Sequence, residues 1–243
     1  MIKGIGGQPY INLDPFLPIN SIPNIREAVI ESYDLIRFSN PQTTFDVNGN
    51  ITQKYTYGGK SYKDVWTQEM KTGECGVGGY FFLLQREGKK SNNKFGEGYT
   101  WIYDSIIDDD NIWDSFKWVN LPKIWKPWMD WVESLPFKKF GQVGIFLQRP
   151  YIKPQHHTDN KTDEQPYPHR QEFIRVEIDE KHFHILNVPN DPVQVTNKAI
   201  FFNQQNLHGS DQYSTTWKIS AKIDGVFTDE FREKIGIGNL DRY

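Results

Sequence analysis

The chain has 243 residues, of which 37% are hydrophobic and 15% aromatic, and its formal net charge is −3. This composition is typical of a folded protein with a sizeable core and argues against disorder over most of the chain. No run approaches the roughly 20 apolar residues of a membrane span, and no long basic run suggests a nucleic-acid surface. The single cysteine, Cys75, cannot form an internal disulfide, and no secretory signal begins the sequence, so we expect a cytoplasmic protein.

The N-terminal part, residues 1–135, is predicted to contain two helices and a buried strand. Apolar residues at helical spacing predict the first helix from Asn24 to Phe38. The run GGYFFLLQ, residues 78–85, is typical of a buried strand. The second helix is predicted from Leu121 to Leu135, with Pro122 in its first turn.

Short strands dominate the sequence after residue 136. They are predicted at Gly141–Gln148, Gln171–Ile178, His182–Val188, Ala199–Asn203 and Thr216–Ile223. Strands at this spacing, with turn signals between them, predict an all-β sandwich or barrel. We therefore expect a mainly β protein with a jelly-roll core over residues 136–226, flanked by the N-terminal helices and followed by a tail over residues 227–243. No linker separates these parts, so residues 1–243 are expected to form a single domain.

Three residues of the predicted core could hold a metal ion. His157 and Asp159 lie two positions apart, and residues two apart in an extended segment point to the same side. His208 follows an apolar strand and could supply a third ligand, although it could also be a turn histidine bonded to the backbone. Two imidazoles and one carboxylate hold one face of Fe(II) and leave the opposite face open for other ligands.

The last predicted strand carries a second polar feature. Apolar side chains alternate there with Lys218, Ser220 and Lys222. One interpretation is a strand with one solvated face. The other is that Lys218 and Ser220 point into the barrel, where an ammonium and a hydroxyl could bind a carboxylate.

Three segments resemble the motifs of the Fe(II)/2-oxoglutarate-dependent dioxygenases. They are LPFKKFGQVGIFLQRPYIKPQHHTDN, FFNQQNLHGS and WKIS, which together fall within about residues 120–225. They are most similar to the branch that includes aspartyl/asparaginyl β-hydroxylase-like and prolyl hydroxylase-like proteins. Lys218 stands where that family more usually has arginine, and the N-terminal half carries no such resemblance.

The resemblance implies a double-stranded β-helix, a cupin-like jelly roll, that uses Fe(II), 2-oxoglutarate and O2 and releases succinate and CO2. It implies that His157, Asp159 and His208 bind the iron. It also implies that Lys218 and Ser220 bind the C5 carboxylate of 2-oxoglutarate. Related halogenases lack the carboxylate ligand, so the presence of Asp159 favours hydroxylation.

Arg175 is a further candidate for a carboxylate contact, and a structural or surface arginine is the alternative. The expected substrate is a small molecule or an amino-acid residue of a peptide, with no nucleic acid and no membrane as partner. Two other functions stay open. One is another mononuclear metal enzyme, a hydrolase or isomerase that holds Zn(II) or Mn(II). The other is a non-catalytic β-sandwich that binds sugar or peptide through its aromatic side chains. Lys218 separates the oxygenase from the hydrolase, because a hydrolase does not require a carboxylate partner there. Metal content of the purified protein separates the binding module from both.

Overall fold

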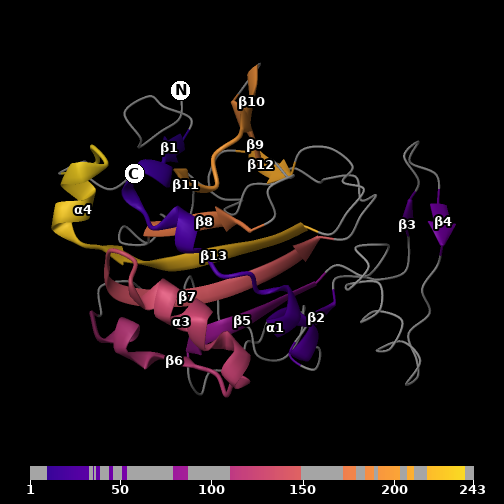
Figure 1. Cartoon of the computed structure of the whole chain (residues 1–243). Helices are drawn as coiled ribbons and strands as arrows, with labels where there is room; N and C mark the ends of the chain where they lie inside the picture. Colours follow the sequence, from indigo (N-terminus) through magenta and orange to yellow (C-terminus); the bar gives the residue numbers. More distant parts are fainter. Residues whose placement is uncertain are drawn as a thin grey trace.

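The structure is a computed structural model of the 243-residue chain (Figure 1). It describes residues 10–32, 35, 37–38, 44–45, 51–53, 79–86, 110–148, 172–178, 184–188, 191–202, 207–210 and 218–238. No helix within these ranges is long and apolar enough to cross a bilayer.

The main element of the described structure is a large antiparallel sheet with the strand order β1-β11-β8-β13-β7-β5-β2, in which β6 also pairs with β5. Its strands are β1 (Tyr10–Asn12), β2 (Arg37–Phe38), β5 (Gly79–Arg86), β6 (Phe116–Trp118), β7 (Phe137–Gln148), β8 (Glu172–Glu177), β11 (Ala199–Phe202) and β13 (Lys218–Phe227). A smaller sheet has the order β10-β9-β12, with β9 at His184–Val188, β10 at Asp191–Val195 and β12 at Leu207–Ser210. The short strands β3 (Thr44–Phe45) and β4 (Ile51–Gln53) pair with each other. The described chain is therefore mainly β, as the sequence predicts.

Few helices accompany the sheets. The α-helices are α1 (Arg26–Glu31), α3 (Lys126–Glu133) and α4 (Asp229–Lys234). The 3-10 helices are η1 (Asp14–Phe16), η2 (Ile19–Ser21), η5 (Asp110–Ser115) and η6 (Lys123–Trp125).

One face of the large sheet is apolar and packs against the N-terminal helices. A buried row crosses it at Phe81, Ile145, Ala221, Val176 and Ala199, which are register partners on five neighbouring strands. The Trp125 indole of η6 meets the Phe81 ring edge-on, with ring centroids 5.7 Å apart. The same indole donates a hydrogen bond of 2.8 Å from Nε1 to the Ser32 hydroxyl at the end of α1. These contacts join both N-terminal helical segments to the sheet.

Two predicted helices are shorter than the sequence suggests. The predicted helix Asn24–Phe38 is wrong beyond Glu31, since Arg37–Phe38 forms β2 and pairs with β5. The predicted helix Leu121–Leu135 corresponds to η6 followed by α3, which ends at Glu133.

A bulge in β13 lies where the backbone passes close to β7. The register between the two strands shifts between Ile223 and Gly225. A Cβ atom added to Gly225 would lie 2.4 Å from the backbone oxygen of Lys139 and 2.6 Å from the Phe137 ring. No side chain fits at this distance, so the close approach of the strands requires glycine at this position.

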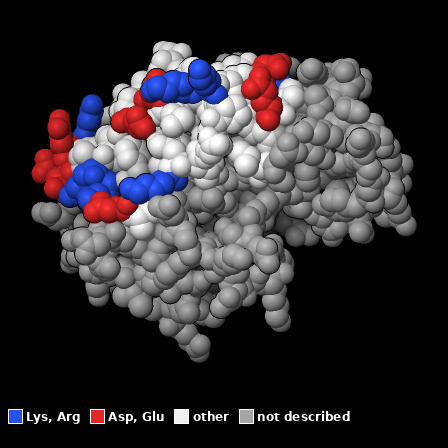
Figure 2. All heavy atoms as spheres, turned by 90° about the horizontal axis from the view of Figure 1, so that it is seen from below, with Lys and Arg blue, Asp and Glu red and all other residues white. Residues whose placement is uncertain are grey.

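Exposed ion pairs lie at the surface, and Figure 2 shows acidic and basic side chains side by side over the described part of one face. Lys138–Asp229 and Lys139–Asp114 join different elements, and Lys126–Asp130 lies within α3. The hydrogen bond from the Lys139 ammonium lowers the pKa of the Asp114 carboxyl below its usual value. Such exposed pairs contribute little stability, because water competes for both charges.

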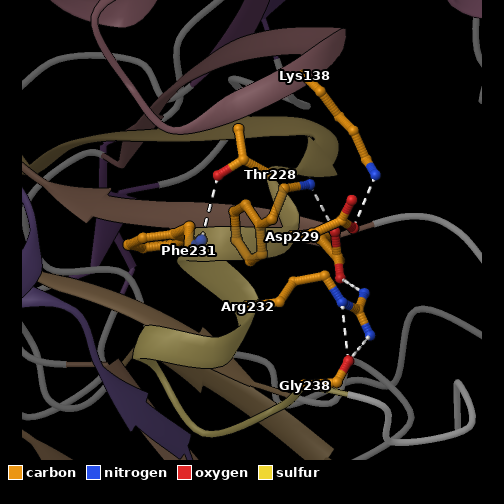
Figure 3. Close-up of polar contacts among 8 residues, drawn as sticks. Lys138, Thr228, Asp229, Phe231, Arg232 and Gly238 are labelled. Atoms are coloured by element: carbon orange, nitrogen blue, oxygen red, sulfur yellow. Dashed lines mark hydrogen bonds and ion pairs between the residues drawn. The ribbon is translucent and has the colours of Figure 1, made fainter.

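Helix α4 lies within the segment expected to be a C-terminal tail, and Figure 3 shows how it is fixed. Thr228 caps its first turn, where the hydroxyl oxygen accepts a 3.2 Å hydrogen bond from the Phe231 amide. The buried Glu172 carboxylate on β8 accepts hydrogen bonds from the Phe227 amide, at 2.6 Å, and from Arg232. The Arg232 guanidinium also donates from Nε and Nη2 to the Gly238 carbonyl oxygen, at 3.2 and 3.1 Å. The Glu172–Arg232 pair therefore fastens the C-terminal helix to the large sheet.

Candidate functional site

The second face of the large sheet is also buried, although β13 places polar side chains on it. Lys218 and Ser220 are each 2% exposed, and Lys222 is partly buried. The interpretation of this strand as having one solvated face is therefore wrong. Alternation of apolar and polar residues in a sequence does not distinguish a solvent-exposed face from a buried face that carries charged side chains.

Strand β8 brings two more charged residues to the same face. In the antiparallel register, Ser220 lies opposite Glu177 and Lys222 lies opposite Arg175. The Arg175 guanidinium donates a 2.6 Å hydrogen bond from Nη2 to the Ser220 hydroxyl. The pairing of two strands that lie far apart in sequence thus creates one polar site.

Glu177 lies between two cations. Its Oε2 atom is 3.0 Å from the Lys218 ammonium, and its Oε1 atom is 3.5 Å from Nε of Arg175. The side chains of Lys218 and Glu177 are only 2% and 6% exposed, so water screens this pair weakly. Glu177 is not among the residues that the sequence singles out. The alternation of Phe173, Arg175 and Glu177 along β8 is the signal that places it beside Arg175.

A second ion pair and two aromatic rings complete the face. The Lys222 ammonium lies 3.5 Å from an Asp224 carboxylate oxygen and 5.0 Å from the centroid of the Phe173 ring. The Arg175 guanidinium lies over the Phe146 ring, 5.1 Å from its centroid. Both distances are typical of cation–π contacts.

We call Arg175, Lys218, Lys222, Glu177 and Asp224 the charged cluster. Lys218 pairs with Glu177, and Lys222 pairs with Asp224. Arg175 shares Glu177 and also bonds to a neutral hydroxyl. Among the described residues, three cations and two carboxylates thus lie together on this face.

His208 lies on the same side of the large sheet as the charged cluster. It is 5% exposed and lies within strand β12 rather than in a turn. Its imidazole meets the Phe202 ring at 5.0 Å between centroids, and Phe202 meets Phe173 at 5.1 Å. Phe173 in turn lies beneath the Lys222 ammonium. A short series of aromatic contacts therefore connects the predicted metal ligand to the charged cluster.

The other two predicted metal ligands, His157 and Asp159, lie outside the described residues. Within the described ranges, no three His, Cys, Asp or Glu side chains are grouped to hold a metal ion. The three-residue ligand set stays a prediction from the sequence.

No family model and no curated protein matches this sequence. Several solved structures are similar to it at low identity. A viral collagen prolyl hydroxylase from Paramecium Bursaria Chlorella virus-1 matches 44% of this chain and 72% of its own, at 17% identity and a TM-score of 0.31. A prolyl-4-hydroxylase from Pseudomonas putida matches 93% of this chain and 96% of its own, at 8% identity and a TM-score of 0.41.

An oxidoreductase of the 2OG-Fe(II) oxygenase family from Burkholderia pseudomallei matches 61% of this chain and 67% of its own, at 9% identity and a TM-score of 0.34. The similar structures named here are thus 2OG-Fe(II) oxygenases and prolyl hydroxylases by their descriptions. Values this low do not establish a function for the present chain, whose function must be argued from its own residues.

Proposed function

We propose that this protein is an Fe(II)- and 2-oxoglutarate-dependent oxygenase with a double-stranded β-helix core. It would hydroxylate a small molecule or an amino-acid residue, with release of succinate and CO2. The observation that carries the proposal is the charged cluster, whose Arg175 and Lys218 lie on the same side of the large sheet as His208.

Two cations of the charged cluster, Arg175 and Lys218, fit the distal carboxylate of 2-oxoglutarate. A buried charge is costly unless another charge or a set of hydrogen bonds compensates it. The planar guanidinium of Arg175 offers paired donors that match a carboxylate. The Ser220 hydroxyl accepts a hydrogen bond from one of its nitrogen atoms, and the Phe146 ring packs against its flat side. A ligand carboxylate would accept hydrogen bonds from Arg175 and Lys218.

The predicted ligand set fits Fe(II). His157, Asp159 and His208 would hold one face of the ion, which leaves positions for the 2-oxo acid and for O2. When bound, the iron and 2-oxoglutarate together supply the oxidising chemistry. The protein supplies ligation, orientation and exclusion of water. Phe202 contacts the His208 ring edge-on, and that contact restricts rotation of the imidazole.

The two alternative functions fit the described residues less well. A zinc or manganese hydrolase has no need of buried cations on the side of the sheet that carries its metal ligand. A sugar-binding module needs exposed aromatic rings, but Trp125, Trp128 and Trp131 are buried in the core. The oxygenase accounts for both the charged cluster and the position of His208.

A succinate-release assay with Fe(II) and 2-oxoglutarate tests the proposed function directly. The wild type is expected to release succinate even without substrate, and a panel of peptides and small molecules would increase the rate. His208→Ala and Asp159→Ala are expected to abolish release and iron binding, while His182→Ala serves as the control. Succinate release by both metal-ligand variants, or none by the iron-loaded wild type, would refute the proposal.

A further inference from the structure

Glu177 contacts both of the cations that are assigned to the cosubstrate. Its oxygens lie 3.0 Å from the Lys218 ammonium and 3.5 Å from the Arg175 guanidinium. We propose that Glu177 is an internal counter-carboxylate, which neutralises Lys218 in the ligand-free protein and competes with the incoming carboxylate for the same donors. This inference rests on the proposed function, because it takes the ligand to be the distal carboxylate of a 2-oxo acid.

The competition follows from the positions of the charges. A ligand carboxylate that bonds to Lys218 and Arg175 must come within a few ångströms of Glu177. At such a short distance two negative charges repel each other strongly when water is largely excluded. The ligand therefore binds more weakly than it would to two uncompensated cations. Glu177 thus sets the affinity of the site for a carboxylate.

Glu177 has a second role in the ligand-free protein. Without Glu177, the buried Lys218 ammonium would lose a counterion 3.0 Å away, which is unfavourable. Glu177 stabilises the ligand-free protein and weakens ligand binding by the same interaction. Its removal should therefore lower the stability of the empty protein and raise the stabilisation that the ligand provides.

Asp224 offers a matched control. It lies on the same face and is similarly buried, with 4% exposure against 5% for Glu177. Its carboxylate pairs with Lys222 at 3.5 Å rather than with Lys218. Glu177→Gln and Asp224→Asn therefore remove the same charge from different cations.

The experiment is a calorimetric titration of 2-oxoglutarate into the Fe(II)-loaded protein without oxygen. We expect Glu177→Gln to bind about tenfold more tightly than the wild type, because a like charge near the ligand is removed. We expect Asp224→Asn to stay within about threefold of the wild type, since its charge lies beside a different cation. In thermal melts, empty Glu177→Gln should unfold at a lower temperature and show a larger increase with 2-oxoglutarate than the wild type does.

Each other outcome overturns the inference. If the wild type binds and Glu177→Gln binds equally or more weakly, Glu177 only positions Lys218, and the proposed function is unaffected. Equal tightening in both variants means that net charge, not the local contact, sets the affinity. If the wild type does not bind 2-oxoglutarate, the proposed function fails as well. Should Glu177→Gln not fold, Glu177→Asp keeps the charge but draws it back from Lys218, and affinity no tighter than wild type would overturn the inference.

Discussion

Strand β8 carries a buried glutamate at each end, and the two carboxylates have different surroundings. Glu172 pairs with Arg232, whose guanidinium also donates to the Gly238 carbonyl oxygen. Glu177 contacts two cations, Lys218 and Arg175, and Arg175 also donates to the Ser220 hydroxyl. The first pair fastens a helix to the sheet, whereas the second group of residues is the one proposed to bind a ligand.

Disruption of the Glu172–Arg232 pair gives the largest expected effect. Arg232→Met removes the Arg232 counterion from the buried Glu172 carboxylate, which should lower the free energy of unfolding by about 3–5 kcal/mol. Urea denaturation measures this change. Lys138→Met, which removes the exposed pair with Asp229, should cost less than about 1 kcal/mol. A loss as small as the control in Arg232→Met would show that the pair does not fasten α4.

Removal of Lys218, which pairs with Glu177 at the other end of β8, should weaken ligand binding. Lys218→Ala should weaken 2-oxoglutarate binding by roughly 10- to 100-fold, because a charge-assisted hydrogen bond is worth about 1.5–3 kcal/mol. Anaerobic titration of the Fe(II)-loaded protein measures the affinity. Lys218→Arg should keep much of it, and iron binding should hardly change. Unchanged affinity in Lys218→Ala would leave Arg175 as the main anchor.

A smaller effect is expected when only a neutral partner is lost. Ser220→Ala removes the hydroxyl that holds Arg175 at 2.6 Å but leaves every charge in place. A neutral hydrogen bond contributes about 1 kcal/mol, so 2-oxoglutarate affinity should fall by about fivefold. The same titration measures it, with stability followed by urea denaturation. A loss as large as that in Lys218→Ala would mean that orientation of Arg175 matters as much as charge.

Loss of the exposed Lys139–Asp114 pair should have the smallest effect on stability. Compared with the buried pairs, it shows how much burial strengthens an ion pair. The hydrogen bond from Lys139 lowers the pKa of Asp114 in the folded protein relative to the unfolded chain. Its contribution is therefore present above the unfolded pKa of about 4 and is lost as pH falls through the folded pKa. Melting temperatures of the wild type and Asp114→Asn should differ slightly near neutral pH and converge in acid. A difference that grows in acid would contradict the sign of this shift.

The strands were easier to predict from the sequence than the helices. Buried runs locate β5, β7, β8, β11 and β13 within a few residues, because each run reflects burial that the sheet provides. Helical spacing continues past Glu31, but the backbone of Arg37–Phe38 pairs with β5, some forty residues later. Local periodicity does not contain that long-range pairing. Helix α4 was not predicted, although Thr228 before Asp229 is a recognisable helix start.

The candidate site was predictable only in part for the same reason. Alternation along β13 indicates that Lys218 and Ser220 share a side, and the structure places both on one buried face. Their contacts with Glu177 and Arg175 depend on the register of β8 against β13, which the sequence does not reveal. The convergence of His157, Asp159 and His208 stays a prediction.

Strand β13 lies between β7 and β8, away from both edges of the large sheet. Backbone amides in such interior strands exchange with solvent mainly when the whole structure opens. The cations of the charged cluster stand on β8 and β13, so their backbone positions are fixed before any ligand arrives. A carboxylate that binds there meets a rigid template, and its association should involve little of the ordering entropy that accompanies loop closure.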